Sequence, residues 1–392
     1  MQERLEYIMI TIGIECEQLE GKRFGVGHTL ATLLEYVSHI SDVEKQFKFF
    51  LYFKTEIPSD AFLSHPAFEK RILTGGIIPK SFNIFYHILL PVRYWQDGLD
   101  LFFFPSYMLP AFFIGKACVV LTNDVYWEAH YGNLPFRYRI SYRIFCWWAA
   151  KRAKKVITIS NFSAKELEKF YDIEPARIIV NPWGIDSLFS AIPKDKEYQK
   201  KIKRQYGIAD DFFLSVGQAF PRRHIREIIN AFAIIAPRYQ KLHYIVACRD
   251  AYNPPLLETL ISQTNKKLGR KGIIYAPYLK REEMPYLMNA AKALIYISDK
   301  EAMGLPPLEA LACKTPSIVI DNDLSKEMLG NEGFFIKDGN DIQEIAKNME
   351  KILENPYLVN TLIEKQIPRL ARFNWHENAK NFLAVAREIS QT

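Results

Sequence analysis

Two glutamates in the second half of the chain combine acid chemistry with a glycine turn. Glu301 and Glu309 stand eight positions apart in ISDKEAMGLPPLEALACKTPSIVI, a segment that reads as a strand, a loop and a helix. Gly304 lies between them, and a glycine there lets the backbone approach a ligand closely. Glu309 falls in the first helical turn, where a carboxylate is favourable in any case, and Glu301 alone could be an ordinary loop acid. Their pairing around G-L-P-P is more specific than either acid, so it favours a polar ligand site.

A second candidate is an anion site in the segment FFLSVGQAFPRRH. A strand, a tight turn at Gly217 and a helix start leave free backbone N–H groups and a helix dipole facing outward. Arg222 and Arg223 add two planar guanidinium groups that suit phosphate oxygens. For these residues alone, a solvated basic helix cap is the alternative.

Short apolar runs alternate with amphipathic segments over most of the chain, which is typical of βαβ units and parallel sheets. Helical patterns run through residues 227–239, 282–291, 308–312 and 341–353, and three helical segments are expected after about residue 340. We predict an α/β fold of two doubly wound domains, joined by a linker near residues 184–205 that becomes a lysine-rich helix. The expected strands cover 7–14, 47–53, 99–104, 117–122, 155–160, 212–217, 243–248, 272–276, 293–298 and 316–320, with a strand-like run at 177–180 before the linker.

The amino-acid composition indicates the general class of protein. With 49% hydrophobic and 24% charged residues, the 392-residue chain is an ordinary globular protein and neither disordered nor collagen-like. The 51 Lys and Arg exceed the 44 Asp and Glu by 7, a mild excess that fits an anionic substrate or a membrane surface better than nucleic acid. Five isolated cysteines indicate a reducing cytoplasm without disulfides or a zinc site. We expect no signal peptide and no membrane-spanning segment, because the most apolar stretch, 99–121, is interrupted by prolines and charges.

Seven elements in the same order resemble the retaining glycosyltransferases of family four. EAMGLPPLEALACKTP resembles their E-x7-E signature, and SVGQAFPRRH resembles their V-G-x-x-x-P-R-K-N element. The other five are RFGVGHTLATLL, FFPSYMLP with VVLTNDVYW, KVITISNFSAKEL, VNPWGID and FNWHENAKNFL. The resemblance implies a GT-B architecture, in which two Rossmann-like domains with parallel sheets face a central cleft. Residues 1–190 would be the acceptor-side domain, with a final helix of about 375–392 packed back on it, and residues 205–370 would bind the nucleotide sugar.

The resemblance also implies roles for the residues of the two motifs. Arg223 would take the place of a phosphate-binding lysine at the turn of Gly217, and Arg222 would supply further positive charge. Glu309 would accept hydrogen bonds from ribose hydroxyls. Glu301 would lie beside the donor sugar as a catalytic residue.

Backbone contacts to the donor follow from the same comparison. The backbone at Met303, Gly304 and Leu305 would contact the sugar and the diphosphate. Gly25 and Gly27 would bring the first domain close to the diphosphate. Because protein cations would neutralise the diphosphate, we expect neither a metal nor another cofactor.

Some positions depart from the family pattern. Gln218 stands where many members have an arginine, and Met303 replaces a phenylalanine. Asn123 stands where the histidine of a His-Asp pair is common, while Asp124 is retained and remains a catalytic candidate. DND at 321–323 could be a metal-binding D-x-D, although a helix N-cap is the simpler interpretation.

The expected function is retaining transfer of a sugar from a nucleotide diphosphate, with GDP-mannose as the first choice. The acceptor would be a hydroxyl of a saccharide or a lipid-linked saccharide in cell-surface polysaccharide synthesis. A nucleotide-sugar epimerase of the same two-domain architecture remains an alternative, as does a non-catalytic nucleotide-sugar-binding protein.

The segment 136–155 raises the possibility of a peripheral protein on the inner face of the plasma membrane. Its Arg and Lys residues alternate with Tyr, Phe and Trp, a composition that suits the headgroup region of an anionic bilayer. The alternative is that Ile140, Ile144, Trp148 and Ala149, which are close to helical spacing, pack on the sheet and bury one face.

Overall fold

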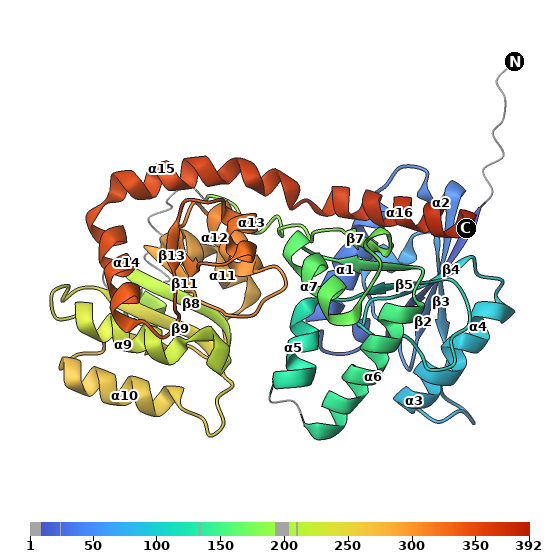
Figure 1. Ribbon diagram of the computed structural model, residues 1–392, viewed down its shortest axis with the longest axis horizontal. Coiled ribbons are helices and arrows are strands. Elements are labelled where there is room, and N and C mark those ends of the chain that lie inside the picture. The colour runs from blue at the N-terminus through green and yellow to red at the C-terminus, as the bar shows by residue number, and fades with distance from the viewer. Residues whose placement is uncertain (1–8, 24, 133–134, 193–203, 209–210) are drawn as a thin grey trace, which may run out of the picture. The chain divides into compact units, whose positions relative to one another are not determined.

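The computed structural model describes residues 9–23, 25–132, 135–192, 204–208 and 211–392. The chain divides into two compact units, Met1–Gly184 with Phe373–Thr392, and Ile185–Arg372 (Figure 1). The lysine-rich helix expected within the linker falls on residues 193–203, which lie outside the described residues. Each unit is built around its own parallel sheet.

The first unit contains a seven-stranded sheet in which every neighbouring pair of strands is parallel. Alternate residues of one strand enter the two cores on opposite faces: Phe49 and Leu51 pack in one, Phe50 and Tyr52 in the other. The strand order is β3 (Phe68–Ile72), β2 (Phe47–Phe53), β1 (Ile10–Glu15), β4 (Leu101–Phe104), β5 (Ala117–Val120), β6 (Lys155–Thr158) and β7 (Ile178–Val180).

Helices cover both faces of this sheet, which explains why its central strands are apolar on both faces. The last helix of the chain returns to this unit and packs against the first helix and against β1 and β4 (Figure 1). The helices are α1 (Gly25–Ser38), α2 (Val43–Gln46), α3 (Phe82–Ile84), α4 (Leu90–Gln96), α5 (Asn123–Tyr131), α6 (Phe136–Arg152), α7 (Asn161–Tyr171) and α16 (Trp375–Gln391).

The second unit repeats the plan with six parallel strands. Their order is β10 (Ile273–Tyr275), β9 (His243–Asp250), β8 (Phe212–Ala219), β11 (Ala293–Tyr296), β12 (Ser317–Ile320) and β13 (Phe334–Ile336). The helices are α9 (Ile225–Ile235), α10 (Leu257–Leu268), α11 (Met284–Ala290), α12 (Leu305–Ala312), α13 (Asp323–Leu329), α14 (Ile342–Glu354) and α15 (Pro356–Gln366).

The predicted α/β class with two doubly wound parallel sheets is confirmed, and so are the three helical segments after residue 340. Two strands were missed. β3 reads FEKRI, and three of its five residues are charged because it is an edge strand with alternate residues facing solvent. β13, a three-residue strand at the other sheet's edge, was the second.

Both sheets reverse their strand order at one point. This happens between β1 and β4 in the first unit and between β8 and β11 in the second. Open α/β sheets bind ligands outside the carboxyl ends of the strands at such a switch point. The two candidate segments of the sequence leave the sheet there, since Gly217 lies in β8 and Glu301 follows β11.

Within the described ranges, no helix combines the length and the apolar character needed to cross a bilayer.

A buried amide adds polar contacts to the apolar packing that attaches α16. Asn378 Nδ2 donates hydrogen bonds to the carbonyls of Asn181 (3.2 Å) and Pro182 (2.8 Å), and the Asn181 side chain donates back to Asn378 O (3.0 Å). These bonds join the exit from β7 to a helix almost two hundred residues later in the sequence.

We predict that Asn378→Ala lowers the unfolding free energy of the first unit by about 1–3 kcal/mol, because it leaves two buried carbonyls without donors. Tryptophan fluorescence in urea measures this directly, since all six tryptophans lie in that unit. Lys380→Ala, which removes an exposed ion pair on the same helix, is the control. Equal midpoints for the two variants would contradict the assignment.

Candidate active site

An ion pair at the switch point of the second unit joins the two candidate motifs. Arg223 Nε and Nη2 donate to Glu301 Oε1 at 3.0 and 2.8 Å, and both side chains are largely buried. The Arg223 guanidinium also lies over the ring of Tyr296, 5.0 Å from its centroid, at the end of β11. The structure therefore brings the predicted phosphate-binding cation and the predicted catalytic acid into direct contact.

Two glycines with positive φ lie beside this ion pair. Gly217 has φ +106°, and a Cβ built on it would come within 2.8 Å of Arg223 Nη1. Gly304 has φ +77° and is the N-cap of α12, so its backbone leads directly into the helix start at Leu305. A residue with a side chain would be strained at either φ value, so both positions favour glycine, as the sequence predicted.

The loops that follow β8 and β11 are joined by further contacts. Arg222 Nε donates to the carbonyl of Lys300 (3.2 Å), and Asp299 N donates to Arg222 O (3.1 Å). His224 Nε2 lies 2.8 Å from Asp299 Oδ2. Burial lowers the pKa of His224, but pairing with Asp299 outweighs burial and leaves the pKa above its usual value. His224 was missed in the sequence, where only its place after two arginines marks it.

Glu309 is different from Glu301 because its carboxylate accepts no hydrogen bond from the described part of the chain. Burial raises its pKa to about 7, Arg281 opposes that rise, and Asp186 adds to it. Arg281 and Asp186 are themselves ion-paired. The carboxylate of Glu309 is thus held in a half-buried site with its acceptor capacity unused.

Met303 and the DND loop lie close to Glu301. The Met303 side chain is buried, and it lines a small cavity together with Glu301, Gly304 and Asn322. Asn322 caps α13, since its side chain accepts a hydrogen bond from Ser325 N (2.8 Å). The N-cap interpretation of the DND sequence is therefore confirmed.

Three predicted residues lie in the first unit. Gly25 and Gly27 form the first turn of α1, and Asp124 lies in the first turn of α5. Asn123, in the place of the family histidine, is fully buried, and its backbone N–H donates to Ser163 Oγ (3.1 Å). Asn123 therefore helps to pack α5 against α7. The other predicted site residues belong to the second unit: Gly217, Arg222, Arg223, Glu301, Met303, Gly304, Leu305 and Glu309.

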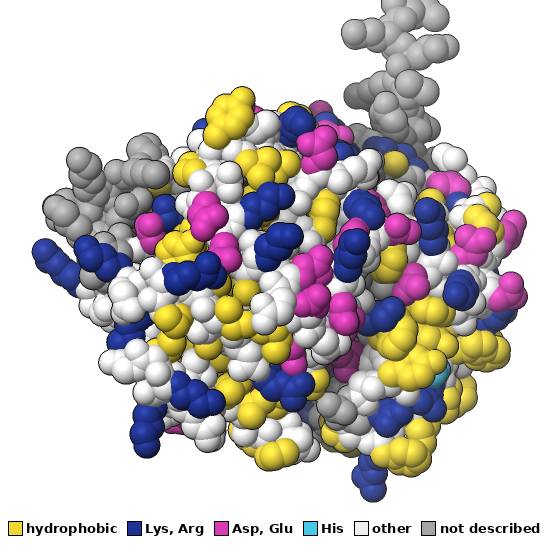
Figure 2. Space-filling model, turned by 60° about the vertical axis from the view of Figure 1, so that its left-hand side comes forward, with side chains coloured by type: hydrophobic (Ala, Val, Ile, Leu, Met, Phe, Trp, Pro, Cys, Tyr) yellow, Lys and Arg dark blue, Asp and Glu magenta, His cyan; other side chains and the backbone are white. Residues whose placement is uncertain are grey.

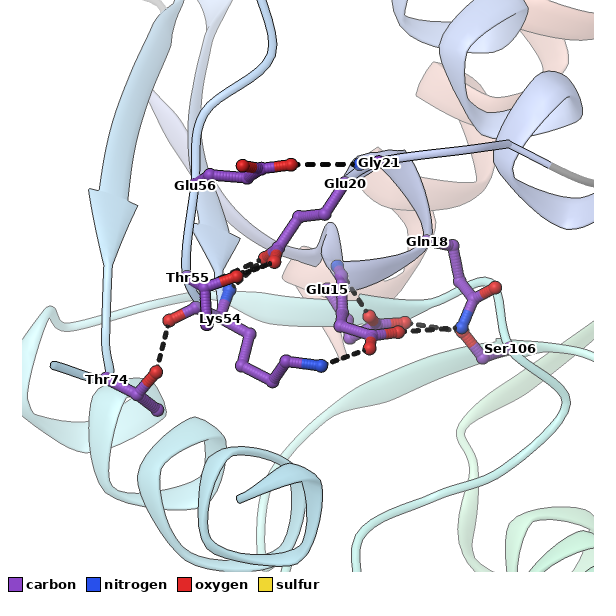
Figure 3. Close-up of polar contacts among 10 residues, drawn as sticks. Glu15, Gln18, Glu20, Gly21, Lys54, Thr55, Glu56, Thr74 and Ser106 are labelled. Atoms are coloured by element: carbon purple, nitrogen blue, oxygen red, sulfur yellow. Dashed lines mark hydrogen bonds and ion pairs between the residues drawn. The ribbon is translucent and has the colours of Figure 1, made fainter. Parts of the chain in front are cut away.

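A polar cluster that no sequence motif marks lies at the end of β1 (Figure 3). The carboxylate of Glu15 is fully buried and accepts hydrogen bonds from Ser106 Oγ (2.5 Å) and Glu17 N (2.8 Å). Burial raises the pKa of Glu15 to about 7. Lys54 pairs with Glu17, and Glu20 accepts from Thr55, so carboxylates tie the loop after β1 to the end of β2.

We predict that the Glu309 carboxyl of the ligand-free protein titrates near pH 7. Its folded pKa lies above the unfolded value of 4.5, so the folded state holds the extra proton and the second unit loses stability as pH rises from about 4.5 to 7. Carbon-13 NMR of labelled glutamates, with Glu309→Gln to assign the signal, measures the pKa. A midpoint below pH 5.5 would contradict the burial effect.

Two family models match the chain. "Glycosyl transferases group 1" covers residues 198–369, and "Glycosyltransferase Family 4" covers residues 77–187. The first includes every predicted residue of the second unit. The second includes Asp124.

Curated relatives are similar at low identity. Serotype-specific mannosyltransferase WbdA of Escherichia coli is 26% identical over 229 residues, and O-antigen chain mannosyltransferase B of the same species is 26% identical over 227. The matches cover 58% and 57% of this chain, and 28% and 58% of those proteins. The chain thus spans about a quarter of WbdA. Alpha-monoglucosyldiacylglycerol synthase of Acholeplasma laidlawii is 25% identical over 343 residues, covering 80% of this chain and 82% of that protein.

Solved structures share the fold along nearly the whole chain. A glycosyltransferase from Rickettsia africae superimposes with a TM-score of 0.69 at 14% identity, covering 98% of this chain and 99% of that one. Anabaena HepE in complex with UDP and glucose gives a TM-score of 0.68 at 15% identity, covering 97% and 100%. The fold is therefore GT-B, as the sequence predicted, and two glycosyltransferase family models, group 1 and family 4, each match one part of the chain.

Proposed function

We propose that the protein transfers a sugar from a nucleotide-diphosphate donor to a hydroxyl of a saccharide or lipid-linked saccharide. The observation that carries the proposal is the contact of Arg223 with Glu301 at the switch point of the second unit, beside two glycines in left-handed conformations. A cation, exposed backbone N–H groups and a helix start are the parts that hold a diphosphate. An acid beside them suits a sugar that gains positive charge.

Each of these groups would have a different role in the transfer reaction. Departure of the nucleotide leaves negative charge on the diphosphate, which Arg223 and the N-terminus of α12 would stabilise. Glu301 would face the sugar as its anomeric carbon becomes oxocarbenium-like. The donor phosphate would accept the proton of the acceptor hydroxyl, giving transfer with retention and without a metal. Glu309, with its unused acceptors, would bind the ribose hydroxyls.

GDP-mannose remains our first choice of donor. The relatives that carry this choice are named mannosyltransferases of O-antigen chains, and polysaccharide synthesis is the corresponding role. A UDP-hexose is the second choice, because HepE has been solved with UDP and glucose. The curated relatives are named for sugar transfer, so transfer is preferred over the epimerase and the non-catalytic binding protein.

We predict that Arg223→Ala weakens binding of GDP by roughly ten- to a hundredfold and leaves binding of guanosine nearly unchanged, because a charge-assisted hydrogen bond contributes about 1.5–3 kcal/mol. Glu309→Ala should weaken both ligands alike, since ribose is common to them. Calorimetry on both ligands makes the comparison. Arg238→Ala removes a cation beyond the end of α9 and is the matched control.

Equal losses for GDP and guanosine in Arg223→Ala would assign a structural role to this arginine. If neither GDP nor UDP binds the wild-type protein, the proposal itself fails.

We further propose that the protein acts on the cytoplasmic side of the membrane as a peripheral protein. One face of α6 exposes four large apolar side chains at helical spacing: Phe136, Ile140, Ile144 and Trp147 are 74%, 40%, 54% and 52% exposed. We name this the outer face of α6. The expected packing of Ile140 and Ile144 on the sheet was wrong, since Cys146, Ala149, Ala150 and Ala153 provide the buried contacts.

A neighbouring loop extends the outer face. Phe112 and Ile114 are 71% and 66% exposed, and their loop is fixed to α6 by the hydrogen bond from Trp148 Nε1 to Pro110 O (3.2 Å). Figure 2 shows hydrophobic side chains gathered with Lys and Arg at the lower right of the face that it presents. Exposed apolar side chains beside cations suit an anionic bilayer.

Two of the cations expected to face the membrane are paired within the protein. Lys155 pairs with Glu388 (2.6 Å) and Lys151 with Asp172 (3.2 Å), so part of the positive charge at the end of α6 is neutralised within the protein. Substitutions on the apolar outer face therefore test membrane binding better than substitutions of these lysines.

We predict that the protein sediments with vesicles containing phosphatidylglycerol and that binding weakens with salt. The double variant Ile144→Ser with Trp147→Ser should reduce the bound fraction severalfold. Tyr357→Ser, an exposed aromatic residue on α15, is the control. Wild-type protein that stays in the supernatant at low salt would contradict peripheral attachment and favour a soluble acceptor.

A further inference from the structure

His224 lies where three loops of the second unit meet. It is the N-cap of α9, directly after Arg223, and its side chain is 6% exposed. Its ring reaches the loop after β11, where Nε2 lies 2.8 Å from Asp299 Oδ2. It also packs against the loop after β13, because a Cβ built on Gly339 would lie 2.5 Å from the same nitrogen. One imidazole therefore connects the loops that follow β8, β11 and β13.

The loops after β8 and β11 are paired residue by residue. Arg222 exchanges hydrogen bonds with the backbone of the two residues before Glu301. Arg223 holds the carboxylate of Glu301, and His224 adds a third link, to Asp299. Asp299 and Glu301 are only two residues apart, so a displacement of Asp299 would also move Glu301 away from Arg223.

Three acids from three elements face the imidazole. Asp299 comes from the loop after β11, Asp338 from the loop after β13, and Glu227 from α9 itself, with its Oε2 3.9 Å from Nδ1. Glu227 is also paired with Arg226. Burial lowers the pKa of His224, and a cation is unfavourable at the start of a helix, but the hydrogen bond to Asp299 and the other two acids leave the pKa above its usual 6.5. The ring is therefore charged at pH 6 and loses its charge as the pH rises through this raised pKa.

The charge strengthens the link to Asp299. An imidazolium donates a stronger hydrogen bond to a carboxylate than a neutral imidazole does, and it adds an attraction between opposite charges. A binding site that is fixed before its ligand arrives loses less entropy on binding. The protonated ring thus holds the loop after β11 in the position from which Glu301 meets Arg223.

We infer that His224 is a positioning residue of the donor site, which in its protonated form locks the loop of Glu301 against Arg223 and strengthens donor binding at low pH. The inference rests on the proposed function, because it takes the donor to be a nucleotide-diphosphate sugar.

Calorimetric titration of the full chain with GDP-mannose and with UDP-glucose, from pH 6 to pH 9, tests the inference. These donors lack a terminal phosphate monoester, whose second pKa of about 6 would add a pH dependence of its own. His224→Gln is the matched variant, because its amide reaches the place of Nε2 and stays neutral at every pH. Glu309 titrates in the same range, but it is present in both proteins and cancels in their ratio.

The dissociation constant of His224→Gln, divided by that of the wild type, should fall from roughly five- to tenfold at pH 6 to near one at pH 9. His224→Asn, which tolerates the positive φ of this position better, should give the same trend. In an Asp299→Asn background, His224→Gln should change binding less than twofold at pH 6, because the two residues act as a pair. His376→Gln, an exposed histidine of the first unit, is the control and should give a ratio near one throughout.

A ratio that stays constant with pH would assign a merely structural role to His224 and overturn the inference. So would an undiminished effect of His224→Gln in the Asp299→Asn background. Binding of neither donor at any pH would contradict the proposed function and this inference with it, whereas donor binding with a constant ratio would contradict only the role of His224.

Discussion

The ion pair between Arg223 and Glu301 is the interaction on which the arrangement of the second unit depends. It joins the loops that leave β8 and β11, the two strands at which the sheet reverses its order. A largely buried pair of this kind is retained at a cost in desolvation, which its hydrogen bonds and its contact with Tyr296 offset. Gly217 and Gly304 are required because any side chain would strain the backbone at their positive φ, and at Gly217 it would also crowd the arginine. The pair therefore places a cation and an acid side by side at the edge where such sheets bind ligands.

The two units present different side chains at the same edge of the same topology. In the second, cations, glycines and a helix start meet at the switch point and suit a diphosphate. In the first, a cavity of about 1010 Å³ at the switch point is lined mainly by aromatic rings and neutral polar groups, and the nearby acids Glu17 and Glu15 are paired with Lys54 and buried, respectively.

The fold could be predicted from the sequence because apolar strands and amphipathic helices alternate regularly, and the motif order agreed with one family. Gly217, Arg223, Gly304 and Glu301 could be placed at one edge because they follow strands that the sequence makes apparent. The hydrogen bond between Glu15 and Ser106 could not, since it joins residues 91 positions apart and neither stands in a motif. The buried face of α6 was predicted wrongly for a physical reason. Large apolar residues occur all around it, so its period does not reveal that small residues such as Ala149 provide the buried face.

The most direct test of the central claim is a crystal structure of the protein with GDP, grown in the presence of EDTA. We predict that the diphosphate lies within hydrogen-bonding distance of Arg223 and of the N-terminus of α12, and that the ribose hydroxyls donate to Glu309 without an intervening metal. A nucleotide bound away from Arg223 and Glu309, or a diphosphate that binds only when a divalent cation is restored, would contradict it.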